Sequence, residues 1–445
     1  MRNYFSVILL LLLSIYGCGK GNIKEEAFSK LSGMVKKTFD ENSVKVIVDT
    51  TDVIADIKPE AIRGVNLNNA MQVAKIKDKA AQLKIPTITY PAGNIGDERD
   101  CNSENDLRFF SLQQLLVGKP FTFAQIRVFG GTPEKAIESI ETAKKVGVRV
   151  DVWSIGNEPD LYYKNKAPEW TPEYYSKKFR EIVEAMRSKY PDIKVAGPMV
   201  SQPKDDWIRT FIKENGDLVD VLAWHWYPTS GNEDSEYALS TAERIKDQIQ
   251  TYRTLLKDPS SNPKGYKRDI KLALTEYATH WNTPNSRHIG DIVGGLWLAE
   301  VMGYLAQYKI DFSHYFCFGT YGGHSLFEPD TYFPRPTYWV IYFYANYFGN
   351  KLLNSISSDE KLKVFASTDS EGAKYILLIN KSANIDKQVS INLLNNSSPT
   401  KEVKMYTLSW SETGAKTNAT EIAAFDGKTI TINVPKYTVN AVVIK

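Results

Sequence analysis

Over residues 59–350, segments with a strand-like hydrophobic pattern alternate with segments whose apolar residues recur at helical spacing. Short runs of β-forming residues recur eight times, and most are separated by stretches with apolar residues at helical spacing. The expected strands are Ile62–Leu67, Thr87–Tyr90, Phe121–Phe129, Val148–Ile155, Ile193–Ala196, Val219–Tyr227, Ile270–Tyr277 and Phe312–Phe318. The expected helices include Pro133–Val146, Pro172–Lys189, Ser240–Leu256 and Ile289–Gln307. Eight strand-and-helix units over about 260 residues predict a closed (β/α)8 barrel of the α/β class.

A doubly wound open sheet is the structural alternative to this TIM barrel. An open sheet that binds nucleotides carries a glycine-rich phosphate loop after its first strand. The segment Gly64–Asn69 follows that position with the sequence GVNLNN and has no such loop. The pattern therefore favours the barrel.

The hydrophobic pattern changes from about Leu352 onward. Short alternating strands separated by turn residues replace the helical spacing, which predicts a small β-sandwich. Ser43–Ile57 also has a strand pattern although it precedes the barrel, so we expect it to join that sandwich. The expected division is an N-terminal sandwich strand at residues 43–58, a catalytic barrel at 59–350 and the sandwich at 351–445.

The first residues have the pattern of a targeting segment. Arg2 precedes the apolar run Val7–Leu13, and Ile15–Cys18 resembles a bacterial lipobox. This implies a signal peptide at residues 1–17, acylation of Cys18, a tether at 18–42 and a lipid-anchored place in the cell envelope, periplasmic or at the cell surface. Tyr16 is bulkier than the usual lipobox residue, so secretion with a free Cys18 stays open. The apolar run is shorter than the roughly 20 residues of a membrane-spanning helix.

Composition narrows the classes of partner. The 445 residues are 42% hydrophobic, and 55 basic residues face 52 acidic ones without a basic block, so neither nucleic acid nor an anionic membrane surface is indicated. Aromatic residues make up 12% and suit a groove that stacks sugar rings. Three cysteines provide neither a disulfide framework nor a zinc cluster, although a Cys101–Cys317 bridge stays open.

Two carboxylates end apolar strands and are the expected catalytic pair. Gly156 lets the chain turn after the fourth strand, and Pro159 keeps Glu158 out of a helix, so the Glu158 side chain points onward from the strand end. Glu276 ends the seventh strand in the same way. Active sites of such barrels lie at the C-terminal ends of the strands, and a buried carboxylate there is costly unless it is paired. Two facing carboxylates fit retaining glycoside hydrolysis, in which one protonates the leaving oxygen and the other attacks the anomeric carbon.

The chain resembles the retaining glycoside hydrolases of clan A. It is most similar to the heparanase and β-glucuronidase family and to the related β-xylosidase and α-L-arabinofuranosidase families. The resemblance rests on Asn157–Pro159, Glu276, the loop Tyr90–Asn94, the helix start Gly130–Ala136, and His225–Tyr227. It implies that Glu158 is the acid/base, that Glu276 is the nucleophile, and that Tyr227 donates to the nucleophile.

The same resemblance assigns substrate-binding residues. Asn94 is expected to reach the sugar, and the neutral donors and acceptors Asn157, His225 and Tyr227 suit sugar hydroxyls. Relatives often carry an arginine where this chain has Thr89, so another cation must keep Glu276 ionised: Arg127 is preferred and Arg63 is the alternative. The stacking candidates, each of which also fits the core, are Trp281, Tyr315 and Phe318.

No cofactor or metal is expected. The five histidines form no His-Glu-x-x-His motif. The expected partner is an oligosaccharide or glycoside. We expect a β-glucuronidase-like preference if Arg287 and His288 bind a uronic acid. The alternatives are β-xylosidase or α-L-arabinofuranosidase activity, transglycosylation, or a non-catalytic carbohydrate-binding lipoprotein. The sequence leaves anomer specificity, exo or endo action and oligomeric state open.

Overall fold

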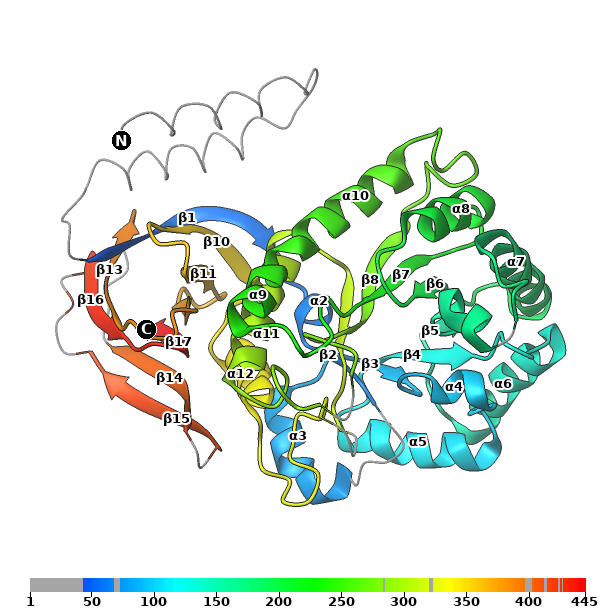
Figure 1. Ribbon diagram of the computed structural model, residues 1–445, viewed down its shortest axis with the longest axis horizontal. Helices are drawn as coiled ribbons and strands as arrows, with labels where there is room; N and C mark the ends of the chain where they lie inside the picture. The colour runs from blue at the N-terminus through cyan, green and yellow to red at the C-terminus, as the bar shows by residue number, and fades with distance from the viewer. Residues whose placement is uncertain are drawn as a thin grey trace.

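The computed structural model describes residues 43–67, 73–165, 167–282, 285–319, 323–396, 402–411, 414–422, 425 and 427–445. These residues form a barrel beside a C-terminal sheet (Figure 1). The signal peptide and tether expected at residues 1–42 lie outside the described residues. Among the described helices, none is both long and apolar enough to cross a membrane.

The barrel is closed by eight parallel strands, as predicted. In order around the barrel they are β2 (Gly64–Asn66), β3 (Thr87–Tyr90), β4 (Phe121–Ile126), β5 (Val152–Ile155), β6 (Val195–Val200), β7 (Val221–Trp226), β8 (Lys271–Tyr277) and β9 (Phe312–Tyr315). Apolar side chains such as Phe123, Met199 and Ala223 pack together as a separate cluster. The larger core lies between the strands and the surrounding helices.

Helices cover the outside of the barrel. They are α2 (Pro59–Ile62), α3 (Lys77–Leu83), α4 (Ile95–Glu98), α5 (Glu104–Leu116), α6 (Pro133–Val146), α7 (Pro172–Lys189), α8 (Asp205–Asn215), α9 (Ser235–Ser240), α10 (Ile245–Lys257), α11 (Ile292–Gln307) and α12 (Pro336–Asn346), with 3-10 turns η1 (Val73–Ile76), η2 (Pro159–Asn165) and η3 (Thr241–Arg244). The bounds of α6 and α7 match the sequence prediction because Thr132 and Thr171 cap their N-termini and a proline follows each cap.

Several element bounds differ from the sequence prediction. The strand expected at Val148–Ile155 begins at Val152, and the last barrel strand ends at Tyr315. The helix expected over Ser240–Leu256 is divided among α9, η3 and α10. Apolar residues continue beyond the hydrogen-bonded parts of these strands because loops at the barrel ends are also buried, so hydrophobicity alone overestimates strand length.

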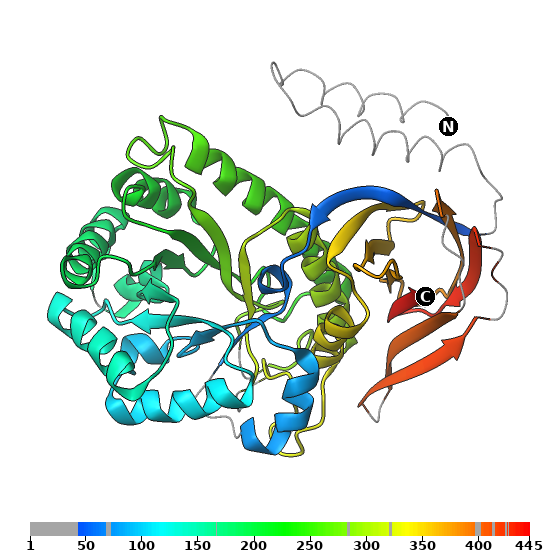
Figure 2. The same cartoon turned by 180° about the vertical axis from the view of Figure 1, so that it is seen from behind.

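The C-terminal part is one hydrogen-bonded sheet of nine strands in the order β15-β14-β17-β12-β11-β10-β1-β13-β16. Its strands are β1 (Val44–Asp56), β10 (Lys351–Ser357), β11 (Leu362–Thr368), β12 (Lys374–Asn380), β13 (Lys387–Leu394), β14 (Val403–Ser411), β15 (Gly414–Glu421), β16 (Thr429–Val434) and β17 (Thr438–Ile444). Val403 near one end and Ile430 near the other belong to the same buried cluster, so the sheet curls around its own core. β1 pairs with both β10 and β13, and its chain then enters the barrel (Figure 2).

The sheet and the barrel share a buried interface. Phe365 of β11 packs against α11 so closely that a Cβ at Gly303 would lie 2.4 Å from the Phe365 ring. Glu300, also in α11, is fully buried and pairs with Lys381, its Oε2 lying 2.7 Å from the Lys381 Nζ. Cys101 and Cys317 are both buried and free, so they do not form the bridge that the sequence left open.

Candidate active site

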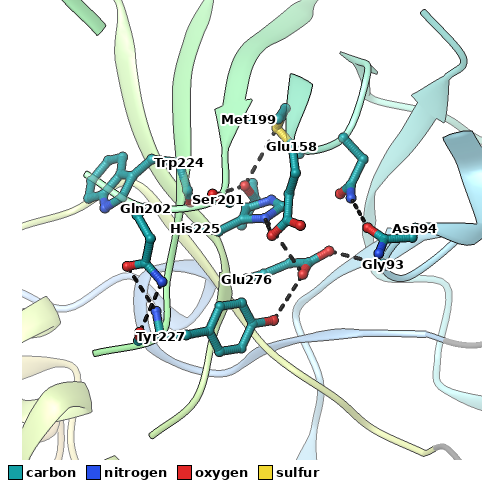
Figure 3. Close-up of polar contacts among 12 residues, drawn as sticks. Gly93, Asn94, Glu158, Met199, Ser201, Gln202, Trp224, His225, Tyr227 and Glu276 are labelled. Atoms are coloured by element: carbon teal, nitrogen blue, oxygen red, sulfur yellow. Dashed lines mark hydrogen bonds and ion pairs between the residues drawn. The ribbon is translucent and has the colours of Figure 1, made fainter. Parts of the chain in front are cut away.

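Glu158 is presented by an unusual backbone at the end of β5. Gly156 and Glu158 both have positive φ, +84° and +47°, and only glycine adopts such values without strain. The Glu158 N–H donates to the Met199 carbonyl at 2.9 Å, which ties this turn to the end of β6. The carboxyl group therefore projects into the mouth of the barrel (Figure 3).

Glu276 lies opposite, near the C-terminal end of β8. The pairing of β7 with β8 shifts by one residue after Trp224, and this shift places His225 beside Glu276. The Tyr227 hydroxyl donates to Glu276 Oε2 at 2.9 Å, and the Gly93 N–H donates to Oε1 at 3.1 Å. Glu276 is 4% exposed, so these two donors hold a buried carboxylate in one orientation.

His225 links the two carboxylates. Its Nδ1 lies 3.0 Å from Glu158 Oε1 and 3.6 Å from Glu276 Oε2. One oxygen of each glutamate and a ring nitrogen of His225 all lie within 4.8 Å of one another. These three donors also have the composition of a divalent-metal site, but the sequence prediction that no metal takes part stays a prediction.

The charges of Glu158, Glu276 and His225 influence one another's ionisation. Burial raises the pKa of Glu276 to about 6, with the charge of Glu158 adding to it and His225, Tyr227 and Gly93 opposing it. Burial disfavours a charged imidazolium, yet the negative charges of Glu276 and Glu158 outweigh it and hold the pKa of His225 above its ordinary value. At neutral pH Glu276 is therefore mostly ionised, and the raised pKa of His225 favours a positive charge beside it.

Amide side chains line the mouth beside Glu158. The Asn157 side chain is buried and donates from Nδ2 to Asn94 Oδ1 at 3.1 Å, which joins the end of β5 to the exposed Asn94. Gln202 was not expected from the sequence. Its Nε2 donates to the Tyr227 carbonyl at 2.9 Å and so fixes the strand end that carries the Tyr227 hydroxyl.

The structure places the three aromatic candidates for sugar stacking in different surroundings. Trp281 is 61% exposed in the loop after β8, so it stays a candidate for stacking. Tyr315 and Phe318 are buried in the core, and the ring of Tyr315 packs edge-on against Tyr277, so neither lines the site as expected. Alternation explains the error for Tyr315, because the next side chain, Phe316, packs against Tyr227 and lies beside Gly93. Phe318 lies beyond the end of β9 and packs against Phe327.

No arginine pairs with Glu276 among the residues that the structure describes. Arg127 donates to the Phe129 carbonyl at 2.7 Å and lies 4.0 Å from Asp100, so the preferred cation for Glu276 is engaged elsewhere. Arg63 donates to carbonyls at the end of α3, including that of Leu83. The basic group beside Glu276 is instead His225, with Nδ1 3.6 Å from Glu276 Oε2, which the sequence analysis placed among the sugar-binding residues.

The two residues considered for uronic acid binding have different surroundings. Arg287 is exposed in the loop after β8 and donates to the Gly231 carbonyl at 3.3 Å. His288 is buried, its Nε2 lies 3.1 Å from the Ser235 hydroxyl, and burial lowers its pKa, so its ring is neutral at neutral pH. Only Arg287 therefore offers a positive charge there.

Sequence reasoning missed two sets of buried polar contacts close to Glu158. Asp160 is buried and accepts hydrogen bonds from the backbone N–H and the hydroxyl of Ser201. It also forms an ion pair with Lys204, whose Nζ lies 2.7 Å from Asp160 Oδ2. Tyr162 and Asp97 form another buried contact at 2.6 Å. Local sequence carries little signal for these pairs because their partners are 41 to 65 positions apart.

Comparisons with known proteins agree with this geometry. Residues 117–287 match the model of the glycosyl hydrolase catalytic core family, a segment that includes Glu158 and Glu276. A heparanase of Rattus norvegicus is 25% identical over 209 residues, 46% of this chain and 38% of that protein. A β-xylosidase of Geobacillus stearothermophilus is 25% identical over 228 residues, 46% of this chain and 43% of that protein. The chain thus spans less than half the length of these relatives.

The whole fold has solved counterparts. The α-L-arabinofuranosidase of Thermotoga maritima superposes with a TM-score of 0.73 over 90% of this chain and 99% of that one, at 17% identity. The barrel with an attached sheet is therefore shared. Together with the sequence matches, this confirms the predicted resemblance to clan A glycoside hydrolases.

Proposed function

We propose that this chain, which carries a glycosyl hydrolase catalytic core in a fold of the clan A type, hydrolyses O-glycosidic bonds with retention of configuration. One observation carries the proposal: oxygens of Glu158 and Glu276 lie within 4.8 Å of each other at the barrel mouth. Retaining enzymes hold their two carboxyl groups about 5–5.5 Å apart, whereas inverting enzymes keep about 6.5–9.5 Å for a water molecule. The observed separation fits direct attack by one carboxylate.

Each carboxylate has a separate role in the proposed double displacement. Glu276 attacks the anomeric carbon while the carboxyl of Glu158 gives its proton to the departing oxygen, which leaves a glycosyl ester on Glu276. Glu158 then removes a proton from water, and that water cleaves the ester and releases the sugar. Tyr227 and the Gly93 N–H hold the Glu276 oxygens throughout.

For the sugar, we propose a β-glucuronidase-like preference. The support is the match to a heparanase and the exposed guanidinium of Arg287 in the loop after Glu276, for which the described residues provide no carboxylate partner. Replacing Arg287 with Ala is then expected to raise KM for a glucuronide more than for a xyloside. The match to a β-xylosidase favours a neutral pentoside as the second candidate, and equal effects on both substrates would support it.

A panel of nitrophenyl glycosides with both anomers tests the activity. The wild-type protein is expected to turn over at least one of them and to release sugar of unchanged configuration, as followed by proton NMR. Binding without turnover across the panel would instead support a non-catalytic carbohydrate-binding protein. Transfer of the glycosyl group to added alcohols would reveal the transglycosylating alternative.

Azide rescue assigns the two carboxylates. In Glu276→Gly, azide replaces the nucleophile and should give a glycosyl azide of inverted configuration. In Glu158→Ala, azide attacks the glycosyl ester and should give product of retained configuration. Glu233→Gln, which alters a carboxylate bound to Ser230 in the loop after β7, is the matched control and should hydrolyse substrate without forming azide product. Unimpaired hydrolysis in either of the first two variants would contradict the assignment.

We also propose a lipid-anchored location in the cell envelope. The support is the sequence alone, in which Cys18 follows an apolar run and a lipobox-like segment. A chain that is secreted with a free Cys18 is the alternative.

A further inference from the structure

Asp97 and Tyr162 form a buried pair behind the acid/base segment. The Tyr162 hydroxyl donates to Asp97 Oδ1 at 2.6 Å, and the Gln125 Nε2 donates to the same oxygen at 3.3 Å. The backbone N–H of Asn157 in turn donates to the Tyr162 hydroxyl at 3.4 Å. Tyr162 is 3% exposed and packs against Phe129 and Trp170, so its hydroxyl has a fixed position.

The segment that carries Asp97 also touches the other catalytic elements. Asn94 accepts from the Asn157 side chain, and the Gly93 N–H donates to Glu276. The Asp97 N–H donates to the Asn94 carbonyl at 2.9 Å, which makes these residues one short turn at the start of α4. This turn therefore supports Asn157 through both its side chain and, by way of Tyr162, its backbone.

The backbone at Glu158 requires such support. A residue with a Cβ is strained at a φ of +47°, and such strain persists only where surrounding contacts impose it. The Glu158 N–H is bound by Met199, and the preceding N–H, that of Asn157, reaches the Tyr162 hydroxyl. Without that hydroxyl, the Asn157 backbone N–H loses this partner, and only the Asn157 side chain still contacts the α4 turn.

We propose that Tyr162 and Asp97 are positioning residues that hold the Asn157–Glu158 backbone and so aim the Glu158 carboxyl at the leaving-group oxygen. This rests on the proposed function, in which Glu158 is the proton donor. The pair touches no reacting atom. Its effect should therefore appear only in the steps in which Glu158 transfers a proton, and kcat/KM reports the first of these, departure of the leaving group.

The surroundings of Asp97 suit this role. Burial raises the pKa of Asp97 to about 8, opposed by the Tyr162 hydrogen bond and by Arg127 and supported by the charge of Glu158. At neutral pH the group is therefore mainly uncharged, and it holds Tyr162 without adding a negative charge beside Glu158.

Leaving-group dependence distinguishes positioning from general damage. A dinitrophenolate departs without a proton, whereas a simple alcohol needs one, so misplacement of Glu158 slows only the second substrate. General acid catalysis contributes about 10²–10⁴-fold, and we expect Tyr162→Phe and Asp97→Ala, which each remove one partner of this hydrogen bond, to lose about tenfold in kcat/KM for the alkyl glycoside and little for the dinitrophenyl glycoside. An equal loss on both substrates, or no loss on either, would overturn the proposal.

Tyr175→Phe is the matched control. The Tyr175 hydroxyl is also buried and donates at 2.6 Å to the Ile155 carbonyl on the same strand, but it does not contact Asn157 or Glu158. Its removal should lower the free energy of unfolding, as measured in urea, without changing the ratio of the two kcat/KM values. A changed ratio in this control would overturn the proposal, because it would show that any buried tyrosine hydroxyl bound to the backbone near the end of β5 has the same effect.

A second measurement does not depend on turnover. Glu158 is one of the two carboxylates that raise the pKa of His225, so a displaced Glu158 should lower the His225 midpoint in a nitrogen NMR titration of Tyr162→Phe. The Tyr175→Phe midpoint should equal that of the wild type. If the wild-type protein cleaves no glycoside, the proposed function fails, and an unchanged His225 midpoint would separately overturn the positioning role.

Discussion

Replacing Tyr227 with Phe should shift the acidic side of the pH–rate profile upward. The change removes the hydroxyl that donates to Glu276 Oε2 at 2.9 Å in a buried setting. A hydrogen bond to a charged group contributes about 1.5–3 kcal/mol, and one pKa unit corresponds to about 1.4 kcal/mol, so losing this bond should raise the Glu276 pKa by about 1–2 units. Glu276 must be ionised to attack. The midpoint of the acidic limb should therefore move above the wild-type value of about 6.

The assay is kcat/KM for an activated aryl glycoside between pH 4 and pH 9, because this ratio reports ionisation in the free enzyme. Tyr344→Phe is the matched control, since the Tyr344 hydroxyl is also buried and donates at 2.7 Å to the Ala299 carbonyl, away from the catalytic pair. The control should leave the acidic midpoint unchanged. An unchanged midpoint in Tyr227→Phe would refute the assignment of that limb to Glu276.

Three further outcomes test the fold and the anchor. Lys381→Met removes the nearer cation from the buried Glu300 and leaves Lys363 at 3.7 Å, so urea unfolding at pH 8 should show a loss of about 3 kcal/mol. Adding Glu300→Gln should restore part of it, and an unchanged unfolding free energy would contradict a structural role for the pair. Deleting residues 43–56 removes β1 from between β10 and β13 and should give aggregated protein by size-exclusion chromatography, whereas a cooperatively melting monomer would contradict its role in the sheet. Cys18→Ala should abolish incorporation of labelled fatty acid and release active protein from the membrane fraction; continued membrane association would refute the lipobox assignment.

Features that depend on local sequence were predictable. The caps Thr132 and Thr171 set the starts of α6 and α7, because a side-chain oxygen that binds a helix N-terminus acts within a few residues. The apolar strands ending at Glu158 and Glu276 were also predictable, because a charged residue directly after an apolar run can be recognised within a few residues of sequence. The family resemblance added the roles of these two residues.

Registers and distant pairs were not predictable from local sequence. Whether Tyr315 or Phe316 faces the site depends on a one-residue alternation that hydrophobicity does not reveal when both residues are aromatic. The placement of His225, and not of Arg127, beside Glu276 depends on the shift in pairing between β7 and β8.

The sequence by itself determined the order of strands and helices, the strand ends that carry Glu158 and Glu276, and the strand pattern of the segment that joins the C-terminal sheet. These properties follow from periodicity and capping, which act over a few residues. Only the tertiary structure decided which side chains meet, as with Asp97 and Tyr162 across 65 positions. Barrel closure fixes the stagger of all eight strands together, so the position of each side chain at the mouth is a property of the closed barrel and not of any one segment.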